Sequence, residues 1–468
     1  MIPSRRGALL DNDEIIQIFH AAVDAVDPRR LAGQALRLSG NQLVAGPQSY
    51  NLDEFPRIIV VGAGKAAAGM GQGVEDVLGA RISAGLLILP RGVEASLQFL
   101  AQTHGGHPLP DEESERATRK ILSLVEPGGE RSLVLCLLSG GASAMLSSPA
   151  PGVSLAGKQE TTALLLRAGA TIGELNAVRK HLSQVKGGRL AAAAFPAALL
   201  TLALSDVPGD RPDVIGSGPT GADRTTFADA WAVIGKYGLM TRIPGGVREF
   251  LERGRSGAES ETLKPGDPRL AHSAFLVIGN NASALAGART AADARGWSGE
   301  ISAAPVQGEA RIAAHSLAAT ALKTQAGLRR GEKRCLLSGG ETTVRVRGKG
   351  RGGRNQELAL AFALAIAGTR GIELLSAGTD GTDGFSDAAG AVVDGSTVDN
   401  AARLGLEAAA FLAANDSHSF FCELDRRSGM RHQLKTGPTG TNVMDLQVIL
   451  VSPPPRGGNP TVNTQTVS

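Results

Sequence analysis

Residues 57–71 read RIIVVGAGKAAAGMG. The apolar run RIIVV is typical of a buried strand, and the stretch that follows Lys65 is typical of a helix. A strand that passes through Gly62-x-Gly64 into a helix gathers backbone N–H groups at the positive end of the helix dipole. This stretch therefore predicts an α/β fold with an anion site in which Gly62, Gly64 and Lys65 take part.

Short apolar runs continue to alternate with helical patterns along the chain. Buried strands are predicted at residues 57–61, 86–89, 133–138, 199–204, 275–278, 335–337, 373–375, 391–393 and 448–451. Helices are predicted over residues 11–26 and from Thr171, which forms a capping box with Glu174, to Gly187-Gly188. This order of elements favours α/β architecture with mostly parallel strands.

The length of 468 residues suggests two or three domains. Polar residues 252–270, rich in Gly and Pro, are typical of a linker or a surface excursion. We expect an N-terminal α/β domain at 1–240 and a C-terminal α/β domain at 241–452, with the option that the last strand returns to the first domain. Residues 453–468 have no core-forming pattern and are predicted to be a disordered tail.

Composition excludes several classes of protein. The net charge is +3, and Cys136, Cys335 and Cys422 are too far apart for a close metal motif. An odd cysteine count without a signal peptide predicts a cytoplasmic location, and no zinc site is expected. The uncharged, Ala-rich run 190–205 is shorter than the roughly 20 apolar residues of a membrane span. The basic stretch 345–357 contains no aromatic residue for base stacking, so no nucleic-acid partner is predicted.

Two short sequences occur twice and in the same order. CLLSGG stands at 136–141 and 335–340, and GPTG stands at 218–221 and 437–440. Each CLLSGG copy predicts a loop in which a serine hydroxyl and glycine amides bind a ligand. The candidate residues are Ser139, Gly140 and Gly141 in the first copy and Ser338, Gly339 and Gly340 in the second. A tight strand-to-helix turn is the less favoured alternative for either copy, and the repeat alone does not show common ancestry.

Charged residues occur where ligands usually bind. Arg354 follows Gly-Gly at a predicted helix start, where it could hold a phosphate or a transition-state charge. Asp206 lies at the carboxyl end of a predicted strand, the usual ligand side of an open α/β sheet. Glu341 could meet a metal or a substrate hydroxyl, or cap a helix.

Residues 378–387 read GTDGTDGFSD. Asp380 and Asp383 are candidate ligands for Mg²⁺ shared with ligand phosphates, and Thr379 is a candidate substrate- or phosphate-binding residue. Asp-Gly turns explain the same residues without a metal, so both interpretations stay open.

Glycine loops, helix-start cations and strand-end aspartates together fit phosphoryl transfer, which needs amides, cations and Mg²⁺ around the transferring group. The chain has no Walker motif. One alternative is an oxidoreductase that uses NAD(P)H, since Gly62-x-Gly64-x-x-Ala67 partly matches a dinucleotide fingerprint. No acidic residue follows the next strand to bind a ribose, which counts against it. A second alternative is a non-catalytic anion-binding protein.

The chain resembles the glycerate 2-kinase family, whose C-terminal half is called the MOFRL domain and whose members were earlier named hydroxypyruvate reductases. The matching segments are VVGAGKAAAGM (60–70), GHPLPD (106–111), LLSGGASAML (137–146), ELNAVRKHLSQVKGGRLA (174–191), LSDVPGDRPDVIGSGPT (204–220), VIGNNASAL (277–285), LLSGGETTVRVRGKGRGGRNQELAL (336–360), AGTDGTDGFSDAAGAVVDG (377–395) and TGPTGTNVMDLQV (436–448). The segment 422–435 departs from the family by being longer and more basic.

The resemblance implies ATP-dependent phosphorylation of D-glycerate at the 2-hydroxyl, with Mg²⁺ or another divalent cation. It implies a Rossmann-like three-layer N-terminal domain, a smaller α/β C-terminal domain of MOFRL type, and an active site in the cleft between them. It also implies catalytic roles for Lys65, Asp206 and Arg354. D-glycerate and ATP are then the expected small-molecule partners, and the oligomeric state is left open, with a homodimer as one alternative.

Overall fold

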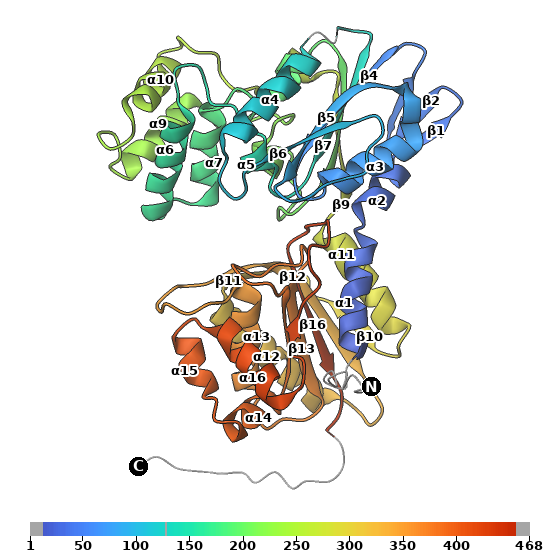
Figure 1. The fold of residues 1–468 in the computed structure, drawn as a ribbon, viewed down its shortest axis with the longest axis vertical. Helices are drawn as coiled ribbons and strands as arrows, with labels where there is room; N and C mark the ends of the chain where they lie inside the picture. The colour runs from blue at the N-terminus through green and yellow to red at the C-terminus, as the bar shows by residue number, and fades with distance from the viewer. Residues whose placement is uncertain (1–12, 127–128, 455–468) are drawn as a thin grey trace, which may run out of the picture. The chain divides into compact units, whose positions relative to one another are not determined.

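A computed structural model describes residues 13–126 and 129–454, and the chain forms two compact units (Figure 1). The N-terminal unit comprises Val23–Ala284 and the short segment Thr439–Met444. The C-terminal unit comprises the described residues of Met1–Ala22, Leu285–Pro438 and Asp445–Ser468. The boundary falls within helix α1 (Asp13–Ala25) and helix α11 (Asn281–Asp293), so both helices contribute to both units.

The sheet of the N-terminal unit has six parallel strands in the order β6-β5-β4-β7-β8-β9. They are β4 (Arg57–Ala63), β5 (Ile82–Pro90), β6 (Ala101–Gly105), β7 (Ser132–Leu138), β8 (Ala198–Leu204) and β9 (Ser273–Gly279). The chain moves outward from β4 to β6 and then crosses back to β7. The order therefore reverses between β4 and β7, and ligands of such sheets bind beyond the carboxyl ends of the strands at that reversal.

Helices cover both faces of this sheet (Figure 1). Helices α4 (Glu112–Val125) and α8 (Arg189–Ala194) share one apolar cluster with Ile59, Leu86 and Val134. Helix α3 (Ala67–Leu78) packs on the opposite face, where its Gly71 lies against Leu87, which points away from Leu86. These layers confirm the predicted three-layer arrangement.

Further elements complete the N-terminal unit. They are α2 (Pro28–Ala35), α5 (Ala142–Met145), α6 (Leu155–Arg167), α7 (Ile172–His181), α9 (Phe227–Lys236), α10 (Gly245–Arg255) and an antiparallel sheet of β1 (Arg37–Ser39), β2 (Gln42–Ala45) and β3 (Gln48–Asn51). The capping box of Thr171 and Glu174 is confirmed at the start of α7. The helix ends at His181 rather than at Gly187, because Leu182 already leaves helical geometry.

The C-terminal unit has a mixed sheet in the order β10-β12-β16-β13-β14-β15, with β11 also paired to β12. The strands are β10 (Ser298–Ile301), β11 (Val306–Glu309), β12 (Arg334–Thr343), β13 (Ile372–Gly378), β14 (Gly390–Asp394), β15 (Gln433–Leu434) and β16 (Asp445–Val451). The prediction of mostly parallel strands holds for the first sheet and is wrong here, because β16 inserts antiparallel between β12 and β13.

Helices of the C-terminal unit pack onto this mixed sheet. They are α12 (Ala310–Gly327), α13 (Arg354–Ala365), α14 (Thr397–Arg403), α15 (Ala408–Ala413) and α16 (Ser417–Ser428). Leu358 and Phe362 of α13 share an apolar cluster with Leu374, Val393 and Ile449 of the strands. In the described part of the chain, no helix is both long and apolar enough to cross a bilayer.

The observed units differ from the predicted boundary between residues 240 and 241. Strand β9 pairs with β8, which keeps residues 241–284 in the N-terminal unit. Strand β16 stays in the C-terminal sheet, and the segment that returns to the N-terminal unit is the loop Thr439–Met444 just before it. The predicted tail lies outside the described residues from 455 onward.

Residues 252–270 are not a linker. Helix α10 extends through Arg255, and Leu263 is 1% exposed. Thr262 is also buried and donates its hydroxyl to Asp223 at 3.0 Å. Polar side chains of this segment are thus buried within the unit. Composition alone does not distinguish such a segment from a solvent-exposed one.

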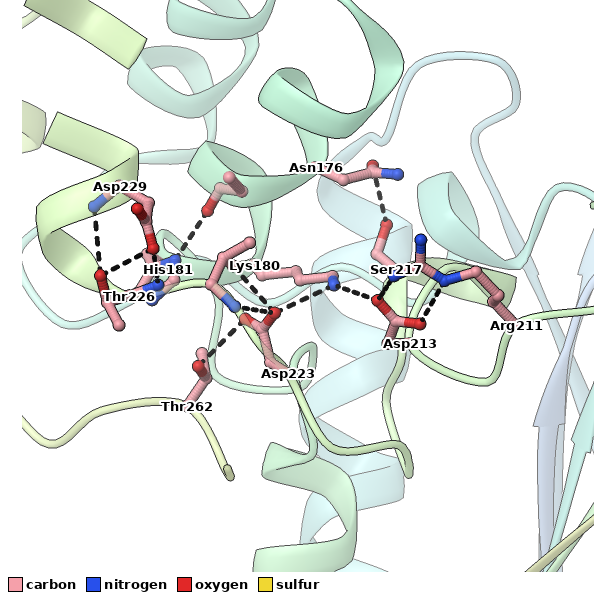
Figure 2. Close-up of polar contacts among 12 residues, drawn as sticks. Asn176, Lys180, His181, Arg211, Asp213, Ser217, Asp223, Thr226, Asp229 and Thr262 are labelled. Atoms are coloured by element: carbon pink, nitrogen blue, oxygen red, sulfur yellow. Dashed lines mark hydrogen bonds and ion pairs between the residues drawn. The ribbon is translucent and has the colours of Figure 1, made fainter. Parts of the chain in front are cut away.

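A buried ion pair fixes the segment that follows β8 to helix α7 (Figure 2). Lys180 lies 3.1 Å from Asp223 and 3.6 Å from Asp213, and Asp223 is fully buried. Asp223 also accepts hydrogen bonds from Thr225 and Thr262. Burial would raise the pKa of Asp223, but the Lys180 charge and these hydrogen bonds outweigh it, and the pKa is lowered.

We predict that Lys180→Met lowers the free energy of unfolding by about 3–5 kcal/mol, because it leaves a buried carboxylate without its cation. Since the folded-state pKa of Asp223 is lowered, its stabilising contribution exists above its unfolded pKa and is lost as pH falls. Urea unfolding near neutral pH should show the full loss, and acid pH a smaller one.

The matched control is Lys236→Met, which removes the exposed Lys236–Glu174 pair. It should change stability by at most about 1 kcal/mol. Equal losses in the two variants would contradict the importance of the buried pair.

Candidate active site

The loops after β4 and β7 are hydrogen-bonded together where the strand order reverses. The Lys65 N–H donates to the Gly140 carbonyl at 2.8 Å, and the Ala66 N–H donates to the Ser139 hydroxyl at 3.0 Å. Gly64 has a φ of +131°, and a Cβ there would overlap Ser139. Glycine is therefore required at position 64 to let the two loops approach.

The amides of this loop do not form the predicted anion site. The N–H groups of residues 64–66 all donate to acceptors within the protein. Gly62 lies inside β4, and a Cβ there would come within 2.6 Å of the Leu137 carbonyl oxygen. Gly62 thus serves strand packing and Gly64 the approach of the two loops, and the half-buried Lys65 side chain is the group of this loop that we expect to reach a ligand.

The Asp206 carboxylate packs directly on Gly140. A Cβ at position 140 would lie 2.5 Å from Asp206 Oδ2 and closer still to Asn442 Nδ2. The Asn442 amide donates to Asp206 Oδ2 at 3.0 Å. The loop that carries Asn442 belongs to the same unit, because Thr441 donates its hydroxyl to the Val26 carbonyl at 3.0 Å. Asp206 is thus oriented by a segment far away in the sequence.

Gly141 is the N-cap of α5 (Ala142–Met145) and has a φ of +86°, and His107 lies beside it. A Cβ at position 141 would be 3.0 Å from His107 Cδ2. The N-terminal unit therefore brings together all seven site residues predicted from its sequence: Gly62, Gly64, Lys65, Ser139, Gly140, Gly141 and Asp206.

Arg354 is the first residue of α13 and is bound by two carboxylates. Its Nε and Nη2 donate to the two carboxylate oxygens of Asp445 at 2.6 and 2.9 Å, and Nη1 donates to Glu341. Burial would lower the pKa of Arg354, but the hydrogen bonds and charge of Asp445, with the charge of Glu341, raise it above the ordinary value. Arg354 is therefore a permanent, oriented cation.

The predicted metal ligands Asp380 and Asp383 have other partners. Asp383 is 1% exposed and accepts the N–H groups of Asn355 and Gln356, both at 2.9 Å, so it caps α13. Burial raises the pKa of Asp383 to about 6, against the lowering effect of these amides. Asp380 accepts from the N–H and hydroxyl of Thr382, as in an Asx turn. This geometry supports the turn interpretation.

No group of three or more His, Cys, Asp or Glu side chains among the described residues is arranged to hold a metal ion. Thr379, which follows β13, is fully buried.

The second CLLSGG copy does not form a loop. Ser338, Gly339 and Gly340 lie within β12, which continues to Thr343. The Ser338 hydroxyl donates to Gln447 of β16 at 3.1 Å, and a Cβ on Gly340 would overlap the backbone of Val306. The predicted ligand loop is wrong for this copy, because strands on both sides extend the sheet past the serine.

Asn442 and Asp445 were not predicted as site residues. Both lie just after the second GPTG copy, so the repeated tetrapeptide was the available signal. Neither could be assigned, because their partners Asp206 and Arg354 are 236 and 91 residues away along the chain.

Comparison with known proteins assigns the two parts of the chain to two family models. Residues 14–252 match a domain of unknown function, DUF4147, and residues 334–445 match the MOFRL family. The chain is 41% identical to D-glycerate 2-kinase of Thermotoga maritima, over 93% of this chain and 97% of that protein. It is 39% identical to a putative hydroxypyruvate reductase of Agrobacterium vitis, over 93% of both chains.

The fold also matches a solved structure. The crystal structure of glycerate kinase from Thermotoga maritima superimposes with a TM-score of 0.80 and 38% sequence identity. The match covers 94% of this chain and 99% of that chain.

We predict that Gly140→Ala lowers the free energy of unfolding by about 1–3 kcal/mol, because a methyl group must displace Asp206 and Asn442. Gly173→Ala is the matched control, since a Cβ there meets nothing within 4 Å. Urea unfolding of both variants measures the effect. A fully stable Gly140→Ala protein would contradict the close packing.

Proposed function

We propose that this chain, which belongs to the glycerate kinase family, transfers the γ-phosphoryl group of ATP to the 2-hydroxyl of D-glycerate, giving 2-phosphoglycerate and ADP. Family membership makes the chain a kinase that acts on glycerate. The observation that carries the finer proposal is the contact of Asp206 with Gly140, beside the loop that bears Lys65.

Asp206 is the proposed acceptor of the hydroxyl proton. Its carboxylate lies at the carboxyl end of β8 and is oriented by Asn442 at 3.0 Å. A carboxylate held in this way can accept the proton of the 2-hydroxyl as its oxygen attacks the γ-phosphorus and ADP departs. A fixed acceptor lowers the barrier because little reorganisation is needed at the moment of reaction.

Lys65 and Arg354 are the proposed counter-charges. Phosphoryl transfer spreads negative charge over the transferring group, and fixed cations stabilise it. Lys65 stands next to the Asp206 site in the N-terminal unit, and Arg354 belongs to the C-terminal unit. In this proposal a phosphate oxygen replaces the exposed Glu341 as a partner of Arg354, while the buried Asp445 keeps the guanidinium in place.

ATP is the proposed phosphoryl donor, with Mg²⁺ as its companion. Mg²⁺ is commonly held by one or two carboxylates together with substrate phosphates. Asp383 is engaged in a helix cap and Asp380 in a turn, so a metal role for these two carboxylates stays a prediction. No step of the proposed mechanism depends on a protein-bound metal.

A single assay separates this proposal from its alternatives. The protein is incubated with D-glycerate and Mg·ATP and, separately, with hydroxypyruvate and NAD(P)H. We expect glycerate-dependent ADP release and no cofactor oxidation. Coupling the product to enolase without a mutase should give phosphoenolpyruvate, since enolase accepts only 2-phosphoglycerate. A need for added mutase would instead indicate the 3-phosphate, and hydroxypyruvate-dependent NAD(P)H oxidation would favour a reductase.

We predict that Lys65→Ala and Arg354→Ala each lower kcat by about 10³-fold or more, because each removes a cation that acts mainly on the transition state. Arg347→Ala, on an exposed stretch near Arg354, is the control and should keep normal kcat. Near-normal turnover of both active-site variants would overturn the assignment.

We predict that Asp445→Asn lowers kcat by about 10²-fold, because a displaced Arg354 loses its alignment with the substrate. Glu341→Gln should cost far less, since this exposed partner is the one that leaves on binding. Steady-state kinetics of the pair test this, and a larger loss in Glu341→Gln would reverse the proposed roles.

A further inference from the structure

Three cationic side chains surround helix α5, which begins immediately after Gly141. They are Lys158 of α6, Arg179 of α7 and Lys186 in the turn that follows α7. Lys158 and Lys186 are 4% and 0% exposed, and Arg179 is half-buried. The cluster reaches the first loop through Ser143, which is three residues beyond Gly140, the glycine against which Asp206 packs.

All the hydrogen bonds of these cations go to neutral oxygens. Lys186 Nζ donates to the carbonyls of Ser143 and Leu146 at 2.7 and 3.1 Å, and Lys158 Nζ donates to the Ser147 hydroxyl at 3.2 Å. Arg179 Nη2 donates to the Ser143 hydroxyl at 2.9 Å. Within the described residues, none of the three forms an ion pair with a carboxylate.

The cation next to Arg179 on helix α7, by contrast, is paired with carboxylates. Lys180 follows Arg179 directly and has two carboxylates, Asp213 and Asp223 (Figure 2). The fold therefore supplies counter-charges to one side of α7 and leaves the side facing α5 positive. Uncompensated buried charge is costly, so a persistent cluster of this kind indicates that an anion completes it.

The electrostatics of the cluster agree with this interpretation. Burial lowers the pKa of Arg179 with no opposing carboxylate. Burial also lowers the pKa of Lys158 to about 7, helped by the charge of Arg179 and opposed by Glu115. The pKa of Lys186 is lowered by burial and by the charges of both other cations. A lysine can relieve the repulsion by losing its proton, but a guanidinium stays charged.

Two hydroxyl groups meet beside Arg179, one on helix α5 and one in a strained turn. Ser143 Oγ and Ser217 Oγ are 2.7 Å apart, and Ser217 contacts Asn176 Oδ1 at 3.4 Å (Figure 2 shows Asn176 and Ser217). Ser217 has a φ of +65°, between two glycines that are also left-handed. Non-glycine residues in this region cost free energy and cluster at ligand sites. The strain keeps the Ser217 hydroxyl directed at Ser143.

We propose that Arg179, with the hydroxyls of Ser143 and Ser217, binds an oxyanion of one of the two substrates, either the glycerate carboxylate or a phosphate of ATP. The inference rests on the proposed function for the identity of the ligand. Arg179 offers a planar fork of donors that matches either group. Lys186 is hydrogen-bonded to α5 at Ser143, Lys158 is hydrogen-bonded to Ser147 just after the helix, and both add positive charge to the cluster.

The test is steady-state kinetics of Arg179→Gln, which keeps polarity and removes charge. Loss of a charge-assisted contact should raise the KM of one substrate by roughly 10- to 100-fold. A rise for D-glycerate assigns the carboxylate, and a rise for ATP assigns a phosphate. Arg179→Lys should be intermediate, since it keeps the charge without the fork. Arg167→Gln, on an exposed position at the end of α6, is the control.

Calorimetric titration of D-glycerate and, separately, of inorganic phosphate into wild type and Arg179→Gln gives a readout independent of turnover. Weaker binding of either probe to a variant that retains the wild-type Tm supports the site. Unchanged KM values and unchanged titrations would overturn it. If wild type releases no ADP with glycerate, the proposed function fails, and the titrations still test the anion site.

Discussion

The hydrogen-bonded contact between the turn at residues 64–66 and the turn at residues 139–141 is the constraint on which the N-terminal site depends. The Lys65 amide reaches the Gly140 carbonyl and the Ala66 amide reaches the Ser139 hydroxyl. Positions 64 and 140 must be glycine, because a Cβ at either position would overlap neighbouring atoms. The absence of a Cβ at Gly140 also leaves room for the Asp206 carboxylate, which packs directly on this glycine. The glycine richness of this chain, 61 of 468 residues, is in part the consequence of such contacts.

The parts of the fold that could be predicted are those with a local signal. The RIIVV and LVLCLL runs gave β4 and β7, because strands buried on both faces are continuously apolar. The two CLLSGG copies show that local sequence does not determine where a strand ends. In the first, the strand stops at Leu138, whereas in the second β12 continues past Ser338 between two partner strands. Identical letters therefore take different structures because their neighbours in the sheet differ.

The candidate site could be predicted in its residue types but not in all its contacts. Lys65, Asp206 and Arg354 stand at strand ends and a helix start, where sequence patterns are informative. Asn442 and Asp445 orient two of them across long separations, which no single sequence reveals. Asp383 was ambiguous for a physical reason: a carboxylate in a glycine-rich loop can bind a metal or cap a helix, and only the position of α13 decides.

The most direct test of the account is a crystal structure of the protein with D-glycerate bound. We expect the 2-hydroxyl to lie within hydrogen-bonding distance of Asp206, near Gly140, with Lys65 beside the ligand. D-glycerate bound away from Asp206, with Gly140 and Lys65 not in contact with it, would contradict the central claim.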